Sequence, residues 1–289
     1  MSLELLASIA IDSIAYGMVL FIITVGLSLT MGLMRVVNLA HGAFAMTGGF
    51  AMVMLMGRLN LSPWLAMGAA VALVALAAWP IERWLVRLFY RRSELDQMLV
   101  TIGLMFVIMA VANILFGSGI ARLELPAALQ GSVQIGPRTV QVQRIFVVVL
   151  GLAVTLLLWA TIERSAFGIR VRAAVDNAPI AAAVGIDTAR VYGIVFALGA
   201  ALAALGGIAG AELLPLESSY AGKYLVLFLA VIAVGGHGTV LGSLVAALLL
   251  AGVETAAKYL LPELASIAFF LTMMLVLVVR PHGLFGSKH

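Results

Sequence analysis

The 289-residue sequence contains no cysteine. This absence excludes a disulfide framework, a thiolate metal site and a cysteine nucleophile. Charged residues are also scarce, at 10% of the chain, whereas 64% of the residues are hydrophobic. A chain of this composition cannot enclose its apolar side chains in one soluble core beneath a polar surface. We therefore expect lipid to surround most of it.

Asp, Glu, Lys and Arg are missing from eight long runs of the chain, which are 13–34, 36–57, 59–81, 97–121, 145–162, 191–211, 224–253 and 264–279. Most of these runs exceed the roughly 20 residues with which a helix crosses about 30 Å of hydrocarbon. None carries the polar stripe of a half-exposed soluble helix, and none alternates as the short strands of a membrane barrel do. The pattern predicts an all-α fold: a polytopic transmembrane helical bundle in a single domain, 1–289.

Basic residues are distributed unevenly between alternate connections of these runs. Eleven lie in one set (Arg35, Arg83, Arg87, Arg91, Arg92, Arg164, Arg170, Arg172, Arg190, Arg280 and Lys288) and six in the other (Arg58, Arg122, Arg138, Arg144, Lys223 and Lys258). The richer set should face the cytoplasm. This places the N-terminus outside and the C-terminus inside, and it requires an odd number of crossings.

The run 224–253 is the one long enough to contain two segments, because a straight helix of 30 residues would be about 45 Å long. Gly235, Gly236, His237 and Gly238 interrupt it. We expect either a turn between two spans or a re-entrant break there. The bundle should then have about nine membrane segments, with broken or re-entrant helices.

Two connections are longer than a turn requires. Residues 117–144 contain an alternating stretch at Ser132–Ile135 and predict an extracytoplasmic loop or a small hairpin. Residues 163–190 form the other connection, on the expected cytoplasmic side.

A short helix is expected within the 163–190 loop. Asp176 or Asn177 can cap its start ahead of Pro179, and Gly185 suits the left-handed position that ends it. A helix of under two turns is not stable alone in water. It should therefore be held by contact with its own protein or with a partner.

Five motifs follow one another along the chain. They are Gly26–Gly32 with Arg35, Asn38, His41 and Gly42; Glu163–Ala173 with Asp176, Asn177 and Ala181–Ile186; Leu202–Gly210; Gly235–Thr239 with Gly242; and Arg280–Gly286. In order and spacing they resemble the branched-chain amino acid permeases of bacterial ABC importers. The resemblance covers nearly the whole chain, and the length is similar to that of the shorter, LivH-type permease of each pair.

The resemblance implies a multi-pass subunit of the bacterial inner membrane. Its implied partners are a second, homologous LivM-like permease, two cytoplasmic ATPases and a periplasmic substrate-binding protein. The implied cargo is leucine, isoleucine and valine, with urea, amides and aromatic compounds as alternatives. The net charge of +4 reflects the ends of membrane segments and indicates no nucleic-acid partner.

Nothing in the sequence suggests that the chain is an enzyme. The Gly-x-x-x-x-Gly-Lys-Ser/Thr phosphate loop does not occur, so ATP would be bound by partner chains and this chain would need no cofactor. His-Glu-x-x-His is also missing, and four scattered histidines predict no metal site. The alternative is an ion-gradient-driven carrier, which would hold Asp or Glu in mid-span. Here the acidic residues lie at span ends or in loops.

Two groups of candidate residues follow. The resemblance implies that the short inner helix couples the permease to the ATPase, through Arg164, Gly168, Asp176, Asn177, Pro179, Gly185 and Ile186. Polar and glycine residues at the expected helix breaks predict a translocation path: Asn38, His41, Gly42, Gly235, Gly236 and His237. The alternative for Asn38 and His41 is structural, with Asn38 capping the second helix and His41 bonding a neighbouring carbonyl.

Other polar and small residues are expected to hold helices together. Thr101 and Asn113 should form interhelical hydrogen bonds, and Glu254 and Lys258 should pair along one helix. Small residues recur four apart and allow close approach of helices. These pairs are Ala45 with Gly49, Gly206 with Gly210, and Gly238 with Gly242.

Overall fold

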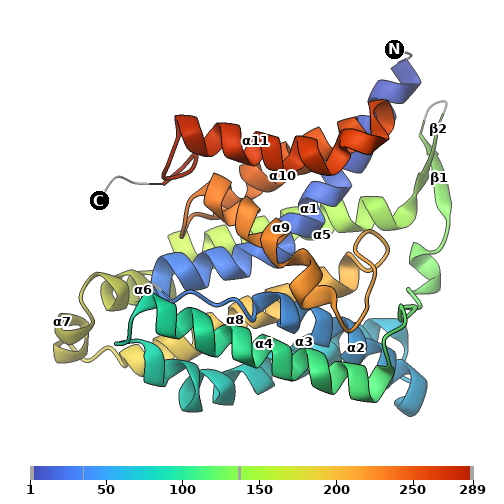
Figure 1. Ribbon diagram of the computed structural model, residues 1–289. Helices are drawn as coiled ribbons and strands as arrows, with labels where there is room; N and C mark the ends of the chain where they lie inside the picture. The colour runs from blue at the N-terminus through green and yellow to red at the C-terminus, as the bar shows by residue number, and fades with distance from the viewer. Residues whose placement is uncertain (1–2, 35, 136–137, 287–289) are drawn as a thin grey trace.

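The computed structural model describes residues 3–34, 36–135 and 138–286, and its architecture is a bundle of helices (Figure 1). The α-helices are α1 (Leu3–Met34), α2 (His41–Leu59), α3 (Pro63–Trp84), α4 (Glu94–Phe116), α5 (Val142–Leu158), α6 (Ala166–Asp176), α7 (Ala178–Ala183), α8 (Thr188–Ala209), α9 (Tyr220–Gly235), α10 (Val240–Leu260) and α11 (Ala265–Val279). Shorter elements are η1 (Val86–Phe89), η2 (Ala127–Leu129), the π-helical turn η3 (Trp159–Glu163) and η4 (Pro262–Leu264).

The predicted hairpin is present in the long connection between α4 and α5. Strands β1 (Ser132–Ile135) and β2 (Arg138–Gln141) pair antiparallel, with Val133 opposite Val140. The alternating sequence explains the strand, because successive side chains of a strand point to opposite faces.

Within the described residues, eight helical segments are long and apolar enough to cross a membrane, when α3 is taken with η1, α5 with η3 and α11 with η4. The helix α9 is also apolar, but it has 16 residues and no adjoining helical element that lengthens it. The run 224–253 is divided as expected, since α9 ends at Gly235 and α10 begins at Val240. Gly236 and Gly238 adopt φ angles of 87° and 80° in between, which non-glycine residues rarely do. The polytopic helical bundle is therefore confirmed.

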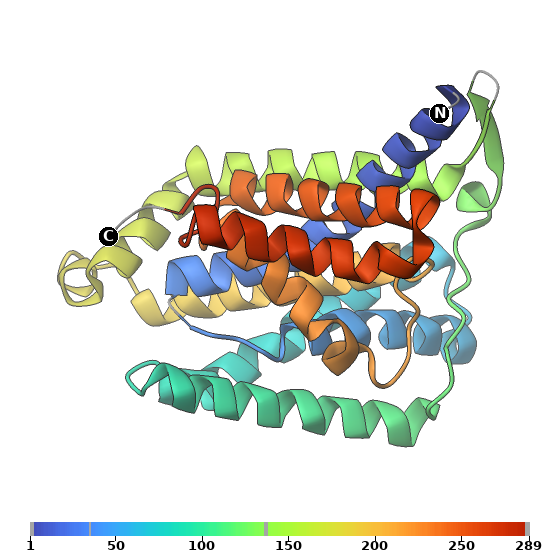
Figure 2. The same ribbon diagram turned by 45° about the horizontal axis from the view of Figure 1, so that its top comes forward.

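The helix α1 passes through the middle of the bundle (Figures 1 and 2). Most of its residues from Ala15 to Leu29 are buried, and small residues bring its backbone against α8. A Cβ added at Gly26 would lie 2.5 Å from the Gly199 carbonyl oxygen, and one at Gly199 would lie 2.9 Å from that of Gly26. Such close approach is what glycine permits at helix interfaces. The helix α4, in contrast, lies at the edge of the bundle (Figure 2).

The predicted small-residue pairs also lie at close contacts. A Cβ added at Gly49 of α2 would lie 2.8 Å from the Leu216 side chain. One added at Gly206 would lie 2.5 Å from the Ile23 side chain, and one at Gly238 would lie 3.0 Å from the Gly32 Cα. Close packing therefore accounts for a small residue at each of these contacts.

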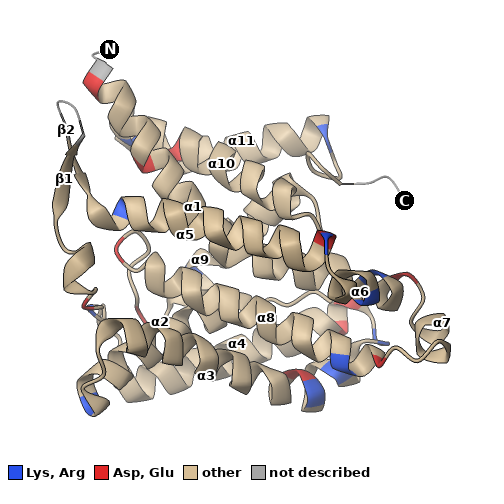
Figure 3. Cartoon of the chain, turned by 180° about the vertical axis from the view of Figure 1, so that it is seen from behind, with Lys and Arg blue, Asp and Glu red and all other residues tan. Residues whose placement is uncertain are grey.

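Charged residues gather toward the two ends of the bundle, and the region between them has few (Figure 3). The N-terminus and the β1–β2 hairpin lie at one end, here called the hairpin end. The helices α6 and α7 and the C-terminus lie at the other, here called the α7 end. Arg35 and Lys288, which entered the comparison of basic residues, lie outside the described residues. The number of crossings and the orientation in the membrane stay predictions.

Candidate functional site

A break in the helices separates α1 from α2, as the sequence predicts. The helix α1 ends at Met34, α2 begins at His41, and the residues 36–40 between them are not helical. Asn38 and His41 are each only 1% exposed. Non-helical backbone at membrane depth needs partners for its amide groups. Residues 36–40, here called the linker segment, are therefore a site where polar groups are concentrated inside the protein.

Asn38 and His41 bond to this chain. The Asn38 Oδ1 accepts a hydrogen bond from the Ala40 amide at 3.1 Å, and the His41 Nε2 lies 2.8 Å from the Ile23 carbonyl oxygen. A carbonyl only accepts, so the imidazole donates from Nε2. The geometry agrees with the structural alternative for His41. For Asn38 it shows a bond just ahead of the helix, where Ala40 is the N-cap residue.

The helix α4 supplies further partners of the linker segment. The Thr101 hydroxyl accepts a hydrogen bond from the Leu39 amide at 3.1 Å, and the Gln97 Oε1 accepts one from the Val37 amide at 3.2 Å. Thr101 therefore bonds outside its helix as predicted, but to the non-helical linker segment and not to another helix; Asn113 likewise accepts a hydrogen bond from Ser218, in the loop before α9, at 3.2 Å. Sequence reasoning missed Gln97, because its partner is 60 residues away.

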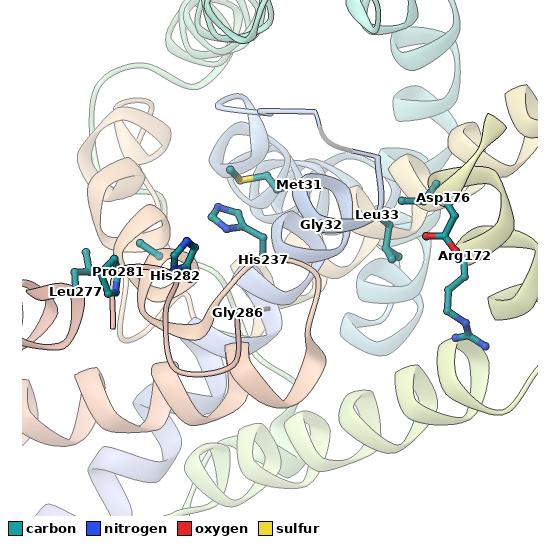
Figure 4. A pocket seen from close by; sticks show the side chains of 12 residues that line it. Met31, Gly32, Leu33, Arg172, Asp176, His237, Leu277, Pro281, His282 and Gly286 are labelled. Carbon is teal, nitrogen blue, oxygen red and sulfur yellow. The ribbon is translucent and has the colours of Figure 1, made fainter. Parts of the chain in front are cut away.

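A cavity of about 620 Å³ opens at the α7 end (Figure 4). It lies between the end of α1, α6, the α9–α10 turn and the C-terminal segment. Figure 4 shows His237 and His282 together on one side and Arg172 and Asp176 on the other. His237 and Asp176, predicted for two different groups, line this one cavity. Asn38, His41 and Gly42 do not line it.

The glycines predicted for the translocation path lie directly against the backbone of neighbouring segments. A Cβ added at Gly42 would lie 3.3 Å from the Ala221 carbonyl oxygen, and one at Gly235 would lie 2.7 Å from that of Gly242. Gly236 lies against the C-terminal segment, where the Phe285 amide donates to the Gly235 carbonyl at 3.3 Å. These residues let helix ends and turns approach one another.

The short helix expected in the 163–190 loop is α7, and its ends follow the predicted rules. The Asn177 side chain accepts a hydrogen bond from the Ile180 amide at 3.1 Å, so Asn177 is the N-cap residue. Gly185 follows the helix with a φ of 88°. Asp176 instead ends a second helix, α6, which we did not expect. Ser165 caps α6 by accepting hydrogen bonds from the Phe167 and Gly168 amides.

Two exposed apolar side chains lie on α7 and at its C-cap residue, Val184. Ile180 is 62% exposed and Val184 is 72% exposed, whereas Ala181 faces the bundle at 3%. Sequence reasoning missed both residues. Their spacing of four places them on the same side of the helix, but only the burial of Ala181 reveals that this side points away from the protein.

The residues predicted for coupling are divided by the structure between surface and interior. Those exposed near α7 are Asp176, Asn177, Pro179 and Gly185. Gly168 is buried and Ile186 packs partly against the core. The Arg164 guanidinium lies 4.4 Å from the Trp159 ring centroid, at the start of the loop. The exposed residues lie around one protruding tip.

The sequence matches the model of a known protein family over most of its length. The model described as the branched-chain amino acid transport system permease component matches residues 9–279. The chain belongs to this family. It is therefore a transport permease, as the resemblance of its motifs implies.

Individual relatives of this permease are similar along nearly their whole length. The high-affinity branched-chain amino acid transport system permease proteins LivH of Salmonella typhimurium and of Escherichia coli K12 are each 26% identical, over 95% of this chain and 94% of theirs. A chain of PsaBC from Streptococcus pneumoniae in complex with Fab has a TM-score of 0.50 at 12% identity, covering 93% of this permease and 89% of that chain. This likeness supports the fold alone.

Carboxylates buried in the permease are paired. Glu254, near the end of α10, forms an ion pair with Lys258 at 2.7 Å and accepts a hydrogen bond from Tyr16 at 3.2 Å. The predicted Glu254–Lys258 pair is confirmed. In the part of the chain that the structure describes, no three His, Asp or Glu side chains are grouped as a metal site.

Proposed function

We propose that this chain is the membrane-spanning permease subunit of an ATP-driven importer in the bacterial inner membrane. Its cargo would be leucine, isoleucine and valine or similar small solutes. The observation that carries the proposal is α7, a six-residue helix at one end of the bundle. The apolar side chains of Ile180 and of the C-cap residue Val184 are exposed there. The family and the LivH relatives support the substrate class.

The α7 end is proposed to face the cytoplasm. Among the described residues, nine basic residues lie in the helix ends and connections at that end: Arg83, Arg87, Arg91, Arg92, Arg164, Arg170, Arg172, Arg190 and Arg280. Six lie toward the hairpin end, in the ends of helices, in β2 or in a connection: Arg58, Arg122, Arg138, Arg144, Lys223 and Lys258. The excess of basic residues favours a cytoplasmic α7 end. With α9 counted beside the eight longer helices, nine crossings carry the chain from outside to inside.

This orientation assigns a role to each end. Residues 117–144, with the β1–β2 hairpin, would face the periplasm and meet the substrate-binding protein. The helix α7 would face the cytoplasm. There a protein partner would cover its exposed apolar side chains, Ile180 and Val184. Since the sequence has no phosphate loop, that partner would be the chain that binds and hydrolyses ATP.

Transport would follow from movement of α7. Closure of two ATPases would shift α6–α7 and the helices joined to them, and substrate would cross at the interface with a second, homologous permease. The linker segment and the α9–α10 turn would lie along this path. The cavity lined by His237 and Asp176 would be its cytoplasmic exit.

Co-purification of ATPase chains tests the proposal. The permease would be tagged, extracted from its native membranes and compared with Ile180→Asp and Val184→Asp. A charge on the apolar surface of α7 should release the ATPases, because a buried unpaired carboxylate is costly. Ile120→Asp is the matched control, since Ile120 is 64% exposed at the hairpin end. Equal amounts of ATPase with all variants, or none with the wild type, would contradict the proposal.

A further inference from the structure

A buried carboxylate lies in the last turn of α3. Glu82 is 0% exposed, and it accepts hydrogen bonds from the Arg87 Nε and Nη2 at 3.0 and 2.7 Å and from the Tyr90 hydroxyl at 2.6 Å. A buried charge is tolerated only when partners surround it in this way. Glu82, Arg87 and Tyr90, here called the inner clamp, therefore form one fixed cluster.

The inner clamp also holds the helices on both sides of α7. The Arg87 Nη2 donates to the Ala189 carbonyl at 2.9 Å, in the first turn of α8. The Tyr90 ring packs edge-on against Tyr192 of α8, with centroids 5.6 Å apart, and the Tyr192 hydroxyl donates to the Ala174 carbonyl of α6 at 2.8 Å. Since α7 connects α6 to α8, a displacement of α7 would also move the parts of α6 and α8 that the inner clamp contacts directly or through Tyr192.

A second set of bonds joins the clamp region to the linker segment. The Gln97 Nε2 donates to the Phe89 carbonyl at 3.3 Å, next to Tyr90 in the chain, and the Gln97 Oε1 accepts from the Val37 amide at 3.2 Å. Thr101, one turn along α4, accepts from the Leu39 amide at 3.1 Å. Gln97 and Thr101 are both buried and are here called the α4 latch.

We propose that the inner clamp and the α4 latch transmit movement of α7 to the linker segment. The contacts are continuous from Ala174 in α6, through the clamp and the η1–α4 turn, to Val37 and Leu39. The side chains involved are positioning residues, because they act on the backbone that leads into α2 and touch no substrate. This inference rests on the proposed function of α7 and adds the route by which its movement reaches membrane depth. Hydrogen-bond networks can carry coupling between distant sites when their elements have two discrete arrangements, and the experiment below tests for a second arrangement of the linker segment.

The absence of cysteine from the chain provides the experiment. Val37→Cys would place a single thiol in the linker segment of the complete complex. Its rate of labelling by a water-soluble maleimide would be measured without nucleotide and with ATP plus vanadate. We expect nucleotide to change the rate by about threefold or more, within the range of known coupling energies. Tyr90→Phe and Thr101→Val should each abolish most of this change while ATP hydrolysis continues.

Two further variants distinguish a loss of transmission from a general effect of removing a hydroxyl group. Thr101→Ser keeps the hydroxyl and should restore the nucleotide-dependent change. Thr272→Val removes a hydroxyl that bonds only within α11, to Ala268 at 2.8 Å, and should behave as the wild type.

The possible outcomes distinguish the inference from the function on which it rests. If Tyr90→Phe and Thr101→Val retain the full nucleotide-dependent change, the transmission route is wrong even though α7 binds an ATPase. If ATPases co-purify but nucleotide leaves the labelling of Val37→Cys unchanged, the linker segment does not move and the inference also fails. If no ATPase co-purifies, the proposed function itself fails.

Discussion

Replacing Gly26 with alanine should force α1 and α8 apart. The new Cβ would lie 2.5 Å from the Gly199 carbonyl oxygen and 2.9 Å from the Gly199 Cα. Nonbonded heavy atoms are most stable at separations of about 3.5–4.0 Å, so the two backbones must move apart by about 1 Å. No flexible side chain lies between them to absorb this movement.

The expected loss of stability follows from the cost of overpacking. Extra methyl groups in a well-packed core cost typically 1–3 kcal/mol, and obstruction by backbone places Gly26→Ala near the upper end, at about 2–3 kcal/mol. For a chain of this size each kcal/mol lowers Tm by about 2–4 °C, so Tm should fall by about 4–12 °C. The fraction of detergent-solubilised protein that stays monodisperse after heating measures this change.

Gly103→Ala in α4 is the matched control, because a Cβ there has no neighbour within 4 Å. Alanine is a better helix former than glycine by about 1 kcal/mol, so this variant should keep or raise Tm. Gly199→Ala should fall between the two, since its Cβ would meet the Gly26 carbonyl oxygen at 2.9 Å. A Tm of Gly26→Ala within about 1 °C of the wild type, or equal losses in Gly103→Ala, would refute the reasoning.

Two further predictions concern the inner clamp. Arg87→Ala leaves the buried Glu82 without its ion partner and should lower the free energy of unfolding by about 3–5 kcal/mol. Adding Glu82→Gln to the same chain should restore part of this loss. Equal Tm values for the single and double variants would contradict the prediction. Burial and, to a smaller extent, the hydrogen bond to Glu82 raise the pKa of Tyr90, so folding favours the neutral phenol. The stability that Tyr90 contributes in this way is complete below the ordinary tyrosine pKa of about 10 and declines as the pH rises above it. Tyr90→Phe should flatten that decline in a pH series of thermal unfolding, and superimposable curves would count against the assignment.

Features set by local chemistry could be predicted from the sequence. The long uncharged runs predict the helices because charge in hydrocarbon is costly. The division at Gly235–Gly238 and the end of α7 at Gly185 follow from the left-handed φ angles that glycine allows. Asn177 caps α7 because its side chain reaches the Ile180 amide. Each of these rules acts within a few residues.

Features that depend on distant partners could not be predicted. Gln97 gives no local sign that it bonds Val37, and Glu82 at a span end looks like any exposed acidic residue until Arg87, Tyr90 and the first turn of α8 surround it. Which side of α7 faces outward depends on packing, so Ile180 and Val184 were missed while Gly168, which is buried, was placed in the coupling group. Tertiary contacts decide these positions.

Uptake of labelled leucine into proteoliposomes tests the central claim most directly. The vesicles would contain the purified complex, with its binding protein outside and ATP enclosed on the α7 side. The wild type should accumulate leucine above the external concentration only when ATP is present, and Ile180→Asp should not. Accumulation that an ion gradient drives without ATP, or that proceeds equally in Ile180→Asp, would contradict the account.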